Sequence, residues 1–157
     1  MKKIFGLFAL MLAFASPAQA GEKEDILNVV ERFFDALRDR DPAVWSEIMT
    51  NQGVITAHRE QADGSWILDA KTNTFQIDRL DKDKAYIDER IWDPTVLVHE
   101  TMAVVWAPYD IYADGSLIHC GVDTFQLFKI DGAWKINHTS YTAEPEGCVD
   151  LAPPARE

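Results

Sequence analysis

Basic residues are scarce in this sequence. It carries 15 lysines and arginines against 26 aspartates and glutamates, which gives a formal net charge of −11. Because like charges repel, a surface of this sign disfavours phosphate backbones and anionic lipid headgroups as partners. We therefore expect no nucleic-acid partner, and the acidity indicates solubility rather than any particular ligand.

Motifs that hold a nucleotide or a metal, or that carry an activated serine, are absent. The chain has no G-x-G-x-x-G, no Walker loop, no H-E-x-x-H and no G-x-S-x-G. Its four histidines are scattered, and none of them lie at the helical spacing of metal ligands. The sequence therefore predicts no metal site and no bound cofactor.

Long apolar runs are also missing. The longest has about twelve residues, from Ile4 to Ala15, and a membrane-spanning helix needs roughly twenty. It follows Lys2 and Lys3 and precedes Ala18-Gln19-Ala20, an order typical of a cleaved signal peptide. We expect residues 1–20 to be removed and the mature protein to lie in the periplasm or to be secreted, without membrane contact.

Cysteine is limited to Cys120 and Cys148. There is no C-x-x-C, and the spacing does not fit a zinc ribbon. An exported protein meets oxidising conditions, so we expect a structural disulfide between them. It would close a loop of about 29 residues and stabilise the fold by ~3.6 kcal/mol in the chain-entropy model. Two buried free thiols are the alternative.

The sequence places helices before strands. Residues 22–40 predict one amphipathic helix, because apolar side chains recur along a single stripe: Ile26, Val29, Val30, Phe33, Phe34 and Leu37. Asp41-Pro42 is a cap followed by a first-turn proline and predicts a short helix over residues 42–49. A third short helix is expected over residues 74–80.

The second half of the chain is rich in strand-forming residues. Strands are expected over residues 53–58, 85–92, 95–112, 116–130 and 133–143. Asp114-Gly115 and Asp131-Gly132 predict tight hairpins between the last three of them. Pro108 in mid-strand suggests a bulge where the sheet bends. We expect one α+β domain over residues 21–144 and a loosely ordered tail over residues 145–157.

Three segments resemble a known family: AVVWAPYDIYADG from residue 103, HCGVDTFQL from residue 119 and DGAWKI from residue 131. They are similar to bacterial members of the nuclear transport factor two-like superfamily, in particular its SnoaL-like or lumazine-binding group. Exported members of that group often end in a Gly-Cys like Gly147-Cys148.

The resemblance implies a fold rather than a reaction. The expected fold is a cone-shaped, cystatin-like α+β barrel, with two to three N-terminal helices packed on a strongly bent antiparallel sheet. It implies one deep pocket and often a dimer through the outer sheet face. Because this fold hosts isomerases, dehydratases, cyclases and pockets without known chemistry, it does not imply one activity.

The two hairpin turns also predict which side chains face the pocket. Two-residue turns would put the apolar set of Met102, Val104, Trp106, Phe125, Leu127, Trp134 and Ile136 on the concave face. The polar residues Asp123, His138 and Ser140 would share that face, with Asp110 and His119 nearer the turn. The residues expected to line a ligand pocket are Trp106, Asp110, His119, Phe125 and Ser140.

Three functions stay open. An exported domain that binds a small apolar or aromatic molecule needs the fewest assumptions. An acid–base enzyme of isomerase, dehydratase or cyclase type would use Asp123 as a buried acid and His138 as base or orienting group, although no second pocket carboxylate is evident. In the plainest alternative these two residues have a structural role only and satisfy each other's hydrogen-bonding groups. The third function is a homodimeric interaction module, whose outer face would carry Val105, Tyr109, Val122, Phe128 and Tyr141.

Overall fold

The computed structural model describes residues 17–82 and 85–156, with side chains from residue 21 onward. Most of the predicted signal peptide, residues 1–16, lies outside the described residues. None of the described helices is both long enough and apolar enough to cross a membrane.

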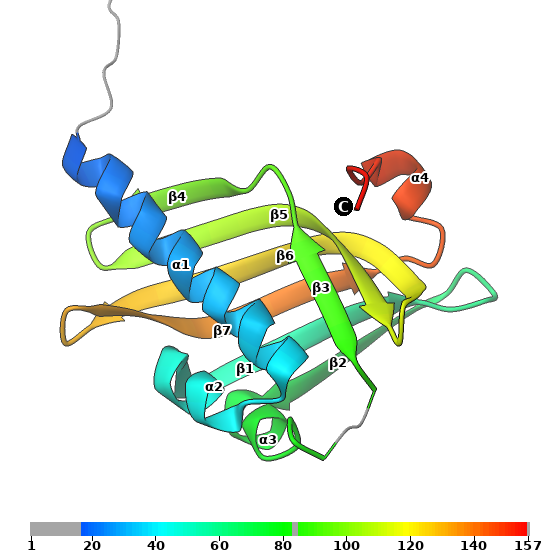
Figure 1. Cartoon of the computed structure of the whole chain (residues 1–157), viewed down its shortest axis with the longest axis horizontal. Helices are drawn as coiled ribbons and strands as arrows, with labels where there is room; N and C mark the ends of the chain where they lie inside the picture. The colour runs from blue at the N-terminus through cyan, green and yellow to red at the C-terminus, as the bar shows by residue number, and fades with distance from the viewer. Residues whose placement is uncertain (1–16, 83–84, 157) are drawn as a thin grey trace, which may run out of the picture.

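Helix α1 (Pro17–Asp39) lies diagonally across the sheet in Figure 1. Its predicted stripe is confirmed, because Ile26, Val30, Phe33 and Phe34 are buried in the core. The short helix α2 (Pro42–Ile48) follows, with Asp41 as its cap. The Asp41 carboxylate accepts hydrogen bonds from the backbone N–H groups of residues 43 and 44, so it satisfies donors that the first helical turn leaves free.

Seven strands form one curved sheet in the order β2-β1-β7-β6-β5-β3, with β4 also paired to β5. Their bounds are Met49–Glu60 (β1), Trp66–Thr72 (β2), Ile87–Ile91 (β3), Thr95–His99 (β4), Met102–Ala113 (β5), Ser116–Ile130 (β6) and Ala133–Ala143 (β7). The sheet is mixed rather than purely antiparallel, because β1 runs parallel to β7. In Figure 1 β3 crosses steeply over the long strands, which shows how strongly the sheet curls.

Three elements differ most from the sequence prediction. Strand β2 was not predicted, because all its residues are exposed and an unburied edge strand has no alternating pattern. The expected strand over residues 95–112 divides into β4 and β5, because Glu100 turns the chain with a left-handed φ of 49°. The third helix, α3 (Asn73–Ile77), is shorter than expected and is capped by the Thr72 hydroxyl.

The predicted hairpin turns are confirmed, but the register beyond them shifts twice. Ala113 pairs with Ser116 as expected, yet Ile118 is an extra residue, and the remaining partners in β5 and β6 slip by one. Asn137 is a second extra residue, which lies within β7 and shifts its pairing with β6. No shift occurs at Pro108, where the bulge was predicted.

A slip of one residue turns side chains to the other face of the sheet. The prediction that Met102, Val104 and Trp106 face the concave side is therefore wrong, and so is the prediction for His138 and Ser140. On β6 the alternation of side chains still places Phe125 and Leu127 inward, since the slips move β5 and the end of β7 relative to β6. Trp134 and Ile136 precede the bulge at Asn137 and keep their predicted face, and all four side chains are buried.

The disulfide between Cys120 and Cys148 is formed. It ties the short helix α4 (Cys148–Leu151) to the outer side of β6. The tail beyond it, which was expected to be loose, contacts the sheet through Arg156, which forms ion pairs with Asp88 and Asp110.

Candidate functional site

A cavity of about 280 Å³ lies between the helices and the concave face of the sheet. Much of its wall is apolar: Phe33, Leu37, Trp45, Ile55, Ile111 and Ile118. The polar residues that line it come from five strands and from α3. An apolar cavity with a few polar groups is the usual form of a small-molecule site.

Two carboxyl groups meet in this cavity. Glu89 lies in the middle of β3, and Asp123 lies on β6, on the far side of β5. The curl of the sheet brings their side chains into hydrogen-bonding contact. Asp123 is only 2% exposed, and no N–H or hydroxyl group of the described residues donates to its Oδ2 atom.

Burial raises the pKa of both acids. The pKa of Glu89 rises to about 8, chiefly because its charged form loses water; the hydrogen bond with Asp123 partly opposes this rise, and the negative charge of Asp110 adds to it. The pKa of Asp123 lies well above its usual range, through burial first and then through the charge and hydrogen bond of Glu89. Since two close carboxylates repel each other, the pair keeps at least one proton at neutral pH.

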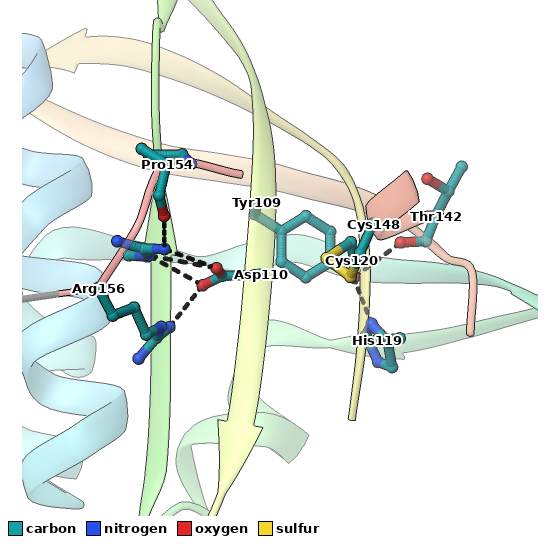
Figure 2. Close-up of a disulfide and its surroundings, with 9 residues drawn as sticks. Tyr109, Asp110, His119, Cys120, Thr142, Cys148, Pro154 and Arg156 are labelled. Atoms are coloured by element: carbon teal, nitrogen blue, oxygen red, sulfur yellow. Dashed lines mark hydrogen bonds and ion pairs between the residues drawn. A yellow bond between two sulfur atoms is a disulfide. The ribbon is translucent and has the colours of Figure 1, made fainter. Parts of the chain in front are cut away.

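Tyr109 and His119 form a second polar pair in the wall. The Tyr109 hydroxyl donates to the carbonyl oxygen of Thr142 at 2.7 Å and lies 3.1 Å from His119 Nδ1 (Figure 2). Burial lowers the pKa of His119 to about 4, with help from the positive charge of Arg59. The imidazole is therefore neutral at physiological pH. Because the one hydroxyl proton is used on Thr142, we assign a proton to Nδ1 that His119 donates to Tyr109.

Arg59 and Tyr141 lie together in another part of the wall. The Arg59 guanidinium donates to the Tyr141 hydroxyl and lies 5.1 Å from the centre of its ring. Arg59 is the only lysine or arginine among the lining residues. Nearby Thr139 is 3% exposed, and its hydroxyl has no hydrogen-bond partner within the described part of the chain. Thr139 Oγ1 is thus a buried polar atom left for a ligand or a water.

Two of the predicted site residues, Asp123 and His119, line this cavity. Phe125 lies beneath it in the core, where its ring packs edge-on against Phe33 at 5.4 Å and Phe34 at 5.7 Å. The placement of Asp123 on the concave face is confirmed, and its catalytic role stays a prediction.

The other predicted site residues lie on the opposite face. Trp106 is 45% exposed on the outer side of β5, and Ser140 and His138 lie outside on β7. His138 Nδ1 accepts a hydrogen bond from the Val54 N–H at 3.1 Å, so His138 does not contact Asp123. Asp110 is buried on the outer face by arginines. The bulges at residues 118 and 137 cause these misplacements.

The predicted interaction face also changes. Val105 and Tyr109 are completely buried on the inner side, and Tyr141 lines the cavity. The apolar side chains exposed there instead include Met102 and Trp106. Homodimerisation stays a prediction.

Glu89 is the residue that sequence reasoning missed. The signal was available in the segment IDERI, because Ile87 and Ile91 share one face of the strand with Glu89. A glutamate between two inward isoleucines is a candidate buried acid. Among the described residues, no three histidine, cysteine, aspartate or glutamate side chains come together as a metal site requires.

Comparison with known proteins identifies the fold. No protein-family model matches the chain, and no curated protein matches it. Solved structures do match the chain. A nuclear transport factor 2 (NTF2-like) superfamily protein from Salmonella enterica serovar Typhimurium LT2 is 14% identical, with a TM-score of 0.65 over 80% of this chain and 93% of that one.

Two further structures agree. A Nostoc punctiforme protein described as having a cystatin-like fold is 14% identical, with a TM-score of 0.64 over 81% of this chain and 94% of the other. A candidate dehydratase of the NTF2-like family from Streptomyces avermitilis is 16% identical, with a TM-score of 0.63 over 80% and 97%. Identities this low establish the architecture and leave the activity open. The chain has the nuclear transport factor 2-like fold, as its sequence resemblance predicted.

Proposed function

We propose that the cavity binds a small, mainly apolar molecule and that the Glu89–Asp123 pair recognises an oxygen atom on it. The observation that carries this proposal is a pair of hydrogen-bonded carboxyl groups facing a largely apolar cavity. A protonated carboxyl group donates a hydrogen bond to a carbonyl or hydroxyl oxygen. That bond is stronger in a buried site, because the local dielectric constant is lower than in water. The cavity volume lies just below the usual range of about 300–1,000 Å³, so the ligand is small.

Acid–base catalysis is the second candidate, and the pKa of Glu89 favours it. A group with a pKa of about 8 exchanges protons readily near neutral pH. Ionised Glu89 would accept a proton from a carbon next to a carbonyl group, while protonated Asp123 hydrogen-bonds to the carbonyl oxygen. Returning the proton to another carbon gives an isomerisation, and returning it to a departing hydroxyl gives a dehydration. The resemblance to a candidate dehydratase supports this class without naming a substrate.

Native mass spectrometry of protein purified from its own host provides the first test. We expect a small molecule to leave with the wild-type protein, and less of it with Asp123→Asn or Glu89→Gln. Ser140→Ala is the matched control, because Ser140 lies on the outer face and does not line this cavity. An empty wild-type cavity, or equal ligand in all four proteins, would contradict the binding proposal.

The same variants separate binding from catalysis. The recovered molecule is incubated with each protein and followed by mass spectrometry and proton NMR in deuterated water. Catalysis predicts conversion or deuterium incorporation with wild type and none with Glu89→Gln. Pure binding predicts an unchanged molecule and an affinity lower by about tenfold in Asp123→Asn.

We also propose that residues 1–20 direct export. The basic start, the apolar run and the small-residue site support this, together with a disulfide that forms readily outside the cytoplasm. Cell fractionation and intact-mass measurement should find the protein outside the cytoplasm with Gly21 as its first residue. Cytoplasmic protein that still begins at Met1 would contradict export.

A further inference from the structure

Glu89 lies on an edge strand of the sheet. In the part of the chain that the structure describes, β3 ends the sheet path and pairs with one strand, β5, from Ile87 opposite Ala113 to Ile91 opposite Tyr109. Because strand side chains alternate, Asp88 and Arg90 point to the outer side while Glu89 points into the cavity. An edge strand has half of its backbone hydrogen-bonding groups unpaired, so its position needs other contacts.

On the inner side helix α1 packs against β3. On the outer side β3 is held by an ion-pair cluster. Arg90 donates to Asp110 through Nη2 at 2.9 Å and through Nε at 3.1 and 3.2 Å. Arg156 pairs with Asp110 (Figure 2). It also pairs with Asp88, so it bridges β5 and β3. The Arg156 guanidinium also stacks on the Tyr112 ring at 3.9 Å.

The C-terminal tail delivers Arg156 to this cluster. Its start is bonded covalently to β6 through Cys148 and Cys120. Its end reaches β3, where the carbonyl oxygen of Pro154 accepts a hydrogen bond from Arg90 at 2.6 Å. Residues 148–156 therefore run from β6 to β3, and both Asp88 and Arg90, the neighbours of Glu89, are held by this tail.

We propose that the C-terminal tail is a clamp that fixes β3 against β5 and thereby sets the Glu89 carboxyl group opposite Asp123. Arg156, Arg90 and Asp110 are then positioning residues for a pair that they do not contact from the cavity side. The proposal rests on the proposed function, since that function uses the pair. It adds that the outer face and the tail control the geometry of the cavity.

Hydrogen–deuterium exchange of the full chain provides the first test, with wild type, Arg156→Gln and the control Arg32→Gln. Arg32 pairs with Glu47 of α2 and belongs neither to the tail nor to β3, so its loss removes an arginine without touching the clamp. In Arg156→Gln we expect the amides of residues 87–91 to exchange about tenfold faster while β6 and β7 stay protected. Unchanged β3 amides, or equal acceleration throughout the sheet, would overturn the clamp.

The pKa of Glu89 gives a readout that a merely stabilising contact would not move. Asp123, Tyr109, Tyr141, His119 and Arg59 face Glu89 across the cavity, and Asp110 acts on it from the outer side of β5. Removing the positive charge of Arg156 would by itself raise the pKa of Glu89, because Asp110 would be less neutralised. Loosening β3 admits water and lowers that pKa towards its ordinary value. The clamp therefore predicts that the pKa of Glu89 is lower in Arg156→Gln than in wild type.

Carbon-13 NMR titration of the glutamate carboxyl groups measures this change, with Glu89→Gln assigning the resonance. The double variant Cys120→Ser/Cys148→Ser releases the tail without changing any charge and should lower the same pKa. Arg156→Lys, which keeps the charge, should restore much of the wild-type value. A pKa of Glu89 that stays at or above the wild-type value in both tail variants would overturn the proposal.

None of these measurements uses a ligand. If β3 loosens as expected but no molecule binds the wild-type cavity, the clamp stands and the proposed function fails. If ligand binds through Glu89 and Asp123 while the tail variants leave β3 and the pKa unchanged, the function stands and the clamp fails.

Discussion

Asp110 and Asp123 are two aspartates on adjacent strands with the same burial and opposite surroundings. They are 1% and 2% exposed, on the outer and inner faces of the sheet respectively. Asp110 is bound by two arginines, whereas Asp123 lies beside another acid and has no ion pair with a basic side chain among the described residues.

Their pKa values diverge for that reason. Burial would raise the pKa of Asp110, but the hydrogen bonds and charges of Arg90 and Arg156 outweigh it and leave the pKa below its usual range. At Asp123 nothing opposes burial, and its pKa rises. The comparison teaches that a cationic partner, rather than depth, decides whether a buried carboxyl group is ionised. The aspartate with the lowered pKa holds two strands and the tail together, and the aspartate with the raised pKa faces the cavity.

The largest expected effect on the free energy of unfolding comes from replacing Asp110, the aspartate with the lowered pKa. Asp110→Asn leaves two partly buried guanidinium groups without their carboxylate, and breaking a buried pair in this way costs about 3–5 kcal/mol. Urea unfolding at neutral pH measures the loss. A change below about 1 kcal/mol would mean that the Asp110 cluster behaves as a surface ion pair, and the comparison would break.

The pH dependence of stability tests the acid pair in the cavity. A pKa of Glu89 raised in the folded protein gives stability that is present below the unfolded value of about 4.3 and is lost as pH rises through about 8. The lowered pKa of His119 acts in the opposite direction, mostly below about pH 6.5. Between about pH 6.5 and pH 8 we expect unfolding free energy to fall by about 1 kcal/mol.

The control for that slope is Glu89→Gln, which cannot titrate. The difference in unfolding free energy between it and wild type isolates the titration of the Glu89–Asp123 pair, because His119 is present in both proteins and Glu89 acts on the pKa of Asp123. The slope should shrink by more than half in the variant. An equal slope in both proteins would show that Glu89 titrates normally.

Asp123→Asn should have a smaller effect, with the opposite sign to that of Asp110→Asn. An amide can hydrogen-bond to Glu89 in either of its protonation states without having to hold a titratable proton itself, so at neutral pH we expect stabilisation by about 0.5–1 kcal/mol. Thermal unfolding beside the Asp110 variant measures the contrast. Destabilisation of both aspartate variants by similar amounts would mean that the two sites are alike.

The smallest effect is expected outside both sites. Trp106→Ala removes a half-exposed indole from the outer face, so ligand affinity should stay within about twofold of wild type, as expected for a residue without a ligand contact. Calorimetric titration with the molecule recovered from the host measures it. A loss of binding would indicate that Trp106 lines the cavity, which would contradict the observed register.

Much of the fold was predictable because its signals are local. The stripe of α1, the Asp41 cap and the two Asp-Gly turns each depend on residues a few positions apart, and all of them are confirmed. The inward placement of Asp123 followed from the same kind of pattern.

The bulges were not predictable in this way. Asn137 bulges where three elements meet: its carbonyl oxygen accepts from Asn73 at 3.2 Å, and a β-carbon on Gly53 would lie 1.6 Å from that oxygen. These partners come from distant parts of the chain. A pattern read along one strand therefore misplaced His138 and Ser140.

The sequence by itself determined most of the elements, their order and the two hairpin turns, because periodicity and turn chemistry act over short distances. Only the tertiary structure decided which face each side chain takes and which acids meet. Glu89 and Asp123 are separated by a whole strand, and the curl of the sheet brings them together. That curl and the two bulges are set by the hydrogen bonding of the entire sheet and by what the helices and the tail bury against it.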